Sequence, residues 1–149
     1  MTYQPRIIVD PEYLQALGQA VYNFTFLEGI VIWTIVKLSP DGFNSVPKGE
    51  TALTIAKALT KAIANALPPL PNSLRLSLIK FDKSYRDAIP LRNKLLHAHP
   101  HTALDGAQQL GGEGYAWPID TVHDAAKFFE EAAMLGNDIF HGDLAKARP

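Results

Sequence analysis

The stretch that decides the fold is residues 10–38, DPEYLQALGQAVYNFTFLEGIVIWTIVKL. Asp10 can accept hydrogen bonds from the first free amides of a helix, and Pro11 suits the first helical turn. No further proline occurs before Pro40. Apolar residues recur three or four positions apart, as on one face of a helix: Leu14, Leu17, Val21, Phe24, Val31 and Ile35. The pattern predicts one long helix.

The second half of this helix is apolar on nearly every side, which predicts a central, buried position in the fold. Glu28 and Lys37 interrupt the apolar run from Phe24 to Leu38. A bilayer span needs roughly 20 mostly apolar residues, which this run does not reach. We therefore expect a core helix rather than a membrane span, and no membrane partner.

Composition places the chain among globular proteins with one domain, residues 1–149. Hydrophobic residues make up 47% and charged residues 19%, enough apolar material for a core. Cysteine is absent, which excludes disulfides and thiolate metal sites and fits a cytoplasmic location. The net charge is −1, from 14 basic and 15 acidic residues. This balance argues against a broad basic surface for nucleic acid.

Three more helices follow along the chain. They are expected at roughly 50–67, from 71 to near 97, and from 120 to 141, where Gly142 closes the last one. Pro90 should kink the third helix. Between the last two, Asp105-Gly106 and the glycines of 111–114 indicate a loop or short β-hairpin. The predicted fold class is all-α, a bundle of four main helices with this insertion before the last.

The densest polar cluster lies at the end of the third predicted helix. It comprises Arg86, Asp87, Arg92, Asn93, His97, His99 and His101. On a regular helix Arg92 and His97 would point about 140° apart. Pro100 forces the helix to end nearby, so the backbone can turn His97 or His99 toward the arginine side. A guanidinium and an imidazole that converge suit a phosphodiester, because one neutralises phosphate charge and the other moves protons near neutral pH.

The segment Arg92-Asn93-Lys94-Leu95-Leu96-His97 resembles the arginine, polar residue, three residues, histidine motif of the HEPN superfamily. The resemblance implies a compact helical bundle and a metal-independent endoribonuclease, with no cofactor. It also implies a homodimer in which the two motifs meet. Arg92 would then stabilise charge on the phosphate, His97 would act as general acid or base, and Asn93 would orient it. The partners implied are RNA and, for a toxin of a bacterial conflict system, an antitoxin protein.

Three residues are candidates for supporting roles: Glu28, Arg86 and His99. Glu28 stands among apolar residues and should need a buried partner, for which Arg92 and Arg86 compete. In a structural alternative, Arg92 pairs with Glu28 and the chain is a non-catalytic helical interaction protein. The two hypotheses differ in whether Arg92 and His97 share one cleft.

Two further alternatives concern the histidine run and the aromatic residues after it. In an extended segment His97, His99 and His101 could line one side and hold a metal ion, although no cysteine can help. Tyr115 and Trp117 could stack on bases, but such residues more often fasten a loop to the core.

Overall fold

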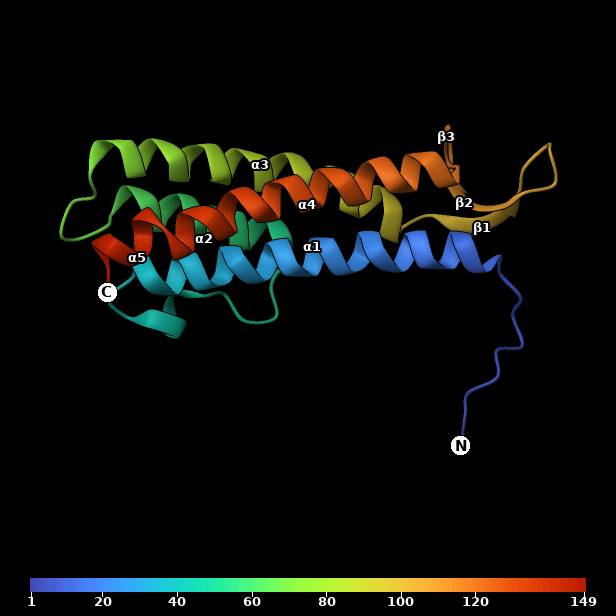
Figure 1. The fold of residues 1–149 in the computed structure, drawn as a ribbon, viewed down its shortest axis with the longest axis horizontal. Helices are drawn as coiled ribbons and strands as arrows, with labels where there is room; N and C mark the ends of the chain where they lie inside the picture. The colour runs from blue at the N-terminus through green and yellow to red at the C-terminus, as the bar shows by residue number, and fades with distance from the viewer.

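The computed structural model describes all residues 1–149 and is mostly helical (Figure 1). In chain order, a three-stranded antiparallel sheet follows the third long helix and precedes the fourth. In chain order the elements are α1(Pro11–Leu38), the 3-10 helix η1(Gly42–Ser45), α2(Ala52–Ala64), α3(Asn72–Leu96), β1(His99–Thr102), β2(Gln108–Gly112), β3(Tyr115–Trp117), α4(Ile119–His141) and α5(Asp143–Ala147). The coarse prediction of four main helices with an insertion before the last is confirmed.

The helix ends follow local chemistry. The Asp10 carboxylate accepts a hydrogen bond from the Glu12 amide at 3.0 Å, which confirms the predicted start of α1. Helix α2 is shorter than predicted at both ends, since Thr51 caps its start and Asn65 is the C-cap after Ala64. Helix α3 continues through Pro90 and ends at Leu96. Helix α4 begins at Ile119, one residue before the predicted start, directly after Pro118.

The core forms where α1 lies along α4 (Figure 1). The rings of Phe24 and Phe129 meet edge to face with centroids 5.3 Å apart. Gly136 allows the close approach of three helices, because a Cβ there would lie 2.3 Å from the Phe81 ring and 2.9 Å from Ile30. A side chain at this position would therefore push α4 away from both α1 and α3.

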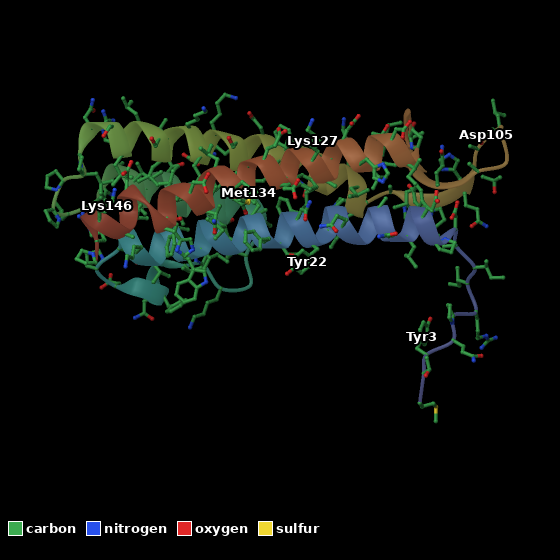
Figure 2. The ribbon with its side chains drawn as sticks, viewed as in Figure 1. Tyr3, Tyr22, Asp105, Lys127, Met134 and Lys146 are labelled. Carbon is green, nitrogen blue, oxygen red and sulfur yellow. The ribbon has the colours of Figure 1, made fainter.

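The opposite side of α1, here called the outer face, is largely exposed, although the Trp33 ring at one end packs edge to face against Phe43 of η1 with centroids 5.1 Å apart. It consists of Leu14, Gly18, Val21, Tyr22, Thr25, Phe26, Gly29 and Trp33. Tyr22 is 66% exposed and points away from the other helices (Figure 2). By length and composition alone α1 could also cross a membrane, and 33% of its most apolar window is buried in this structure. The predicted central, buried position is therefore confirmed for the side of α1 that packs on α4 but not for this face.

The insertion forms antiparallel strands, as the β-hairpin alternative predicted, but there are three of them, in the order β1-β2-β3. The Tyr13 hydroxyl of α1 accepts a hydrogen bond from the Leu110 amide at 2.8 Å. It donates to the Trp117 carbonyl at 2.6 Å. Since Leu110 and Trp117 are register partners, the hydroxyl bridges the end of the β2–β3 ladder. Trp117 is 3% exposed, which confirms that it fastens this segment to the core.

Strand β1 forms one edge of the sheet and contains Pro100 opposite Leu110. The Leu110 amide points toward β3, where it meets the Tyr13 hydroxyl. Pro100 and Leu110 therefore form a non-hydrogen-bonded pair, in which the backbone polar groups point away from each other. The nitrogen of Pro100 consequently lies on the free edge.

We expect Tyr13→Phe to lower the free energy of unfolding by about 2 kcal/mol, because it leaves the Leu110 amide and the Trp117 carbonyl without their partner. Urea titration followed by circular dichroism measures the change. Tyr22→Phe is the matched control, since that tyrosine is exposed and its change should stay within about 0.5 kcal/mol. Equal losses in both variants would contradict the bridging role.

Candidate functional site

A cavity of about 530 Å³ lies between the end of α3 and the start of α2. Four of the six residues predicted for the site line it: Glu28, Arg92, Asn93 and His97. Its other walls are Gly49, Glu50, Thr51, Ala52, Leu53 and Ile89. The structure thus brings together residues from α1, α3 and the segment that leads into α2.

Arg92 is the only lysine or arginine that lines this cavity. Its guanidinium carbon stands 5.6 Å from the centre of the Phe24 ring, and its Nη1 donates to the Asn93 side chain at 3.0 Å. Its Nε is buried and has no hydrogen-bond partner. No carboxylate lies within ion-pair distance of Arg92, so the predicted pairing with Glu28 is wrong. Arg92 is a cation with unused donors.

Glu28 has a different partner, Tyr85 of α3. The Tyr85 hydroxyl donates to Glu28 Oε2 at 2.6 Å and lies 3.4 Å from the Ala52 carbonyl. Burial raises the pKa of Tyr85 far above its ordinary value of 10.0, and the hydrogen bond and charge of Glu28 raise it further. Tyr85 therefore remains a hydrogen-bond donor. Its position seven residues before Arg92, two helical turns away on the same face, was the signal that could have identified it.

The start of α2 adds a second positive feature. Thr51, the N-cap, and Ala52, the first helical residue, both line the cavity. The Thr51 hydroxyl accepts from the Thr54 amide, while the first amides of α2 have no partner within the helix. A helix N-terminus carries a partial positive charge and attracts anions. The carboxylates of Glu28 and Glu50 oppose this attraction on the same walls.

His97 and Asn93 complete the polar wall. His97 is the first residue beyond α3, and its side chain is exposed. It lines the same cavity as Arg92, although a regular helix would separate the two directions. The Asn93 side chain accepts a hydrogen bond from Arg92 and makes none to His97. Asn93 therefore positions the arginine, and the prediction that it orients the histidine is not supported by this geometry.

Arg86 and His99 lie elsewhere. Arg86 pairs with Asp82 at 3.2 Å and donates to the Thr60 hydroxyl at 2.6 Å, which places it in a structural network between α2 and α3. His99 stands exposed on β1. The histidine run forms no metal centre, because the structure contains no group of three or more His, Asp or Glu side chains arranged to hold an ion.

A smaller cavity of about 80 Å³ lies on the other side of Arg92. It shares Arg92 and Glu28 with the first cavity. Its remaining walls are mostly apolar: Ala20, Val21, Phe24, Thr25, Leu95, Leu96 and Phe129. Val21 and Thr25 also belong to the outer face of α1. The outer face therefore borders the smaller cavity that Arg92 lines.

We expect Tyr85→Phe to make stability less sensitive to alkaline pH. Since the folded-state pKa of Tyr85 is raised, its contribution to stability is complete below pH 10 and declines as pH rises above that value. The wild type should lose up to about 1.4 kcal/mol per pH unit through this group, and the variant should lack that slope. Urea titrations between pH 9 and 11 measure it, with Tyr22→Phe as control. Identical pH slopes in wild type and Tyr85→Phe would refute the assignment.

The geometry gives one cavity with an unpaired arginine, an exposed histidine, a helix N-terminus and a carboxylate held by tyrosine. No family model, curated protein or solved structure matches the chain.

Proposed function

We propose that the chain is a metal-independent endoribonuclease of the HEPN type, with Arg92 and His97 as its catalytic residues. One observation carries the proposal. Arg92 and His97 line a single cavity, and the N–H donors of Arg92 are not engaged by any carboxylate of the protein. An arginine that served only to balance Glu28 would form an ion pair with it.

The cavity suits a phosphodiester. Its volume of about 530 Å³ falls within the range of small-molecule sites, about 300–1,000 Å³. The guanidinium of Arg92 and the N-terminus of α2 approach it from two directions, and both favour an anion. The Phe24 ring behind the guanidinium and the Asn93 side chain beside it limit its movement. Such preorganised donors stabilise charge that develops in a transition state.

The reaction proposed is transesterification within RNA. The ribose 2′-oxygen bonds to the adjacent phosphorus, and the bond from phosphorus to the 5′-oxygen breaks. The products are a 2′,3′-cyclic phosphate and a 5′-hydroxyl. A proton leaves the 2′-hydroxyl and another reaches the 5′-oxygen, and His97 performs one of these transfers. Arg92 stabilises the charge on the nonbridging oxygens, while Asn93 positions Arg92.

The charge balance of the chain favours local recognition of RNA. With a net charge of −1, binding depends on a few placed groups rather than on a basic surface. Affinity should consequently fall only weakly with salt, because few phosphate contacts release few counterions. In this proposal the protein is a homodimer in the cytoplasm, acting as a toxin or RNA-processing component whose activity an antitoxin protein restrains.

A second candidate function is that of a non-catalytic helical interaction protein. The observation in its favour is the exposed apolar outer face of α1. The two candidates differ in what Arg92 does. The interaction protein has no need for an arginine with unused donors beside an exposed histidine.

We expect the purified protein to cleave a mixed RNA pool in the presence of EDTA and to leave 2′,3′-cyclic phosphate ends. His97→Ala should slow cleavage by about 10²–10⁴-fold through loss of proton transfer. Arg92→Ala should slow it by about 10²–10³-fold through loss of charge stabilisation. Gel analysis of end-labelled RNA, with enzymatic tests of the termini, measures both effects.

His123→Ala serves as the matched histidine control, because His123 is exposed on α4 and does not line the cavity. It should cleave like the wild type. Circular dichroism confirms equal folding of all variants. Absence of cleavage by the folded wild type, or cleavage indifferent to both substitutions at the site, would favour the interaction protein.

A further inference from the structure

Glu28 is the residue of the larger cavity that the proposed reaction does not use. Its carboxylate lines the same walls as Arg92, beside which a phosphate would bind. Because like charges repel, an ionised carboxylate at this place weakens the binding of an anion. Glu28 also forms no ion pair with Arg92 or with any other cation of the chain. A carboxylate that opposes the phosphate and neutralises no cation points to a ligand group of its own.

The carboxylate of Glu28 is held in place with most of its acceptor positions free. Glu28 is half-buried on α1, and the Tyr85 hydroxyl donates to its Oε2 at 2.6 Å. No group of the protein donates to Oε1. An ionised carboxylate has about four acceptor positions on its two oxygens and no donor, so most of them remain for a ligand. The ligand group beside Glu28 must therefore supply N–H or O–H donors.

The surroundings of Glu28 favour a donor group that is uncharged and flat. A cationic group would meet the guanidinium of Arg92 in the same cavity and would be repelled by it. The apolar walls of the cavity are Ala52, Leu53 and Ile89. Such side chains suit the faces of a nucleobase, whose edge is then read by hydrogen bonds. A neutral, flat ligand group with N–H donors, bound next to a phosphate, describes a base of RNA.

Among the four bases of RNA, only guanine carries two adjacent donors on its Watson–Crick edge. These donors are N1–H and the 2-amino group, which can donate two parallel hydrogen bonds to one carboxylate. Adenine and cytosine present an amino group beside an acceptor nitrogen, and uracil presents one N–H between two carbonyls. Their acceptors would face the carboxylate oxygens without a hydrogen between them. Single-stranded RNA exposes this edge to proteins.

We propose that Glu28 makes the site specific for guanine, its carboxylate binding N1–H and the 2-amino group of the guanine next to the phosphate that Arg92 binds. Tyr85 is a positioning residue, since its hydrogen bond limits the rotation of the carboxylate. Glu50, the other acidic residue of the cavity, is exposed and its side chain has no such partner. This inference rests on the proposed function and adds to it the base that is recognised.

The first test is the affinity for nucleoside 3′,5′-bisphosphates, which carry a phosphate at both ends of one ribose, measured by isothermal titration calorimetry. The wild type should bind the guanosine compound about 10–100-fold more tightly than those of adenosine, cytidine and uridine, as one bidentate base contact implies. The inosine compound, which lacks only the 2-amino group, should bind about 10-fold more weakly than the guanosine compound, because one hydrogen bond to a charged group is lost. Equal affinities for guanosine and inosine, or no binding of either, overturn the proposal.

Glutamine variants assign the preference to one carboxylate. Glu28→Gln should lose most of the guanosine-to-inosine ratio, because its amide places a donor opposite a donor of guanine. Tyr85→Phe should lower the same ratio by a smaller factor, through loss of the positioning hydrogen bond. Glu50→Gln is the matched control: it should change the affinity for all the bisphosphates alike and keep the wild-type ratio. An unchanged ratio in Glu28→Gln overturns the assignment, and a ratio of two ligands is insensitive to a partial loss of folded protein.

RNA cleavage separates this inference from the proposed function. In single-stranded RNAs of varied sequence, the wild type should cleave beside guanosine, and more slowly where inosine replaces that guanosine. Cleavage that is indifferent to the base would leave the proposed nuclease intact and overturn the guanine assignment. Guanosine-selective binding that depends on Glu28, without any cleavage, would refute the nuclease and leave the cavity assigned to guanine nucleotides.

Discussion

The packing of α1 along α4 is the contact on which the rest of the molecule depends. It buries Phe24 against Phe129, and Gly136 lets α4 approach α1 and α3 together. Because α1 is held on this side, Glu28 and Phe24 stand at fixed positions beside the end of α3. The cation–π contact beneath Arg92 and the hydrogen bond from Tyr85 to Glu28 both depend on that placement. The site is thus assembled by helices that a single core interface aligns.

Two residues of the cavity, Arg92 and Glu28, are held in place by neighbouring side chains. Asn93 and Phe24 hold the arginine, and Tyr85 holds the carboxylate. With these partners, Glu28 and Arg92 form no ion pair with each other, although both line the same cavity. An anion that enters the cavity would therefore not have to displace an internal ion pair. The exposed His97 stands at the solvent side of this arrangement.

The sequence was sufficient for the helices and for four residues of the cavity, because these depend on local signals. Asp10 and Pro11 mark the start of α1, and the histidines and Pro100 mark the end of α3. The partner of Glu28 could not be predicted in the same way. Tyr85 is two turns from Arg92 on α3, but its contact with Glu28 depends on how α1 and α3 are placed together. The pairing of Arg86 with Asp82, four residues earlier on the same helix, follows a local spacing that the sequence does contain. The third strand was missed because Asp105-Gly106 and the glycines of 111–114 were assigned to one loop or hairpin, whereas each of the two turns joins a separate pair of strands. The exposure of the outer face of α1 was missed because an apolar pattern does not say how many sides of a helix are covered.

The position of Pro100 bears on how the molecule avoids unwanted association. A sheet edge offers unpaired amides and carbonyls to any passing extended chain, and such pairing is a common beginning of aggregation. Pro100 lies in the middle of β1 with its nitrogen on the free side, so this edge lacks a donor where an added strand would need one. Strand addition there is disfavoured. Replacing this proline would therefore endanger solubility before it affected the helices.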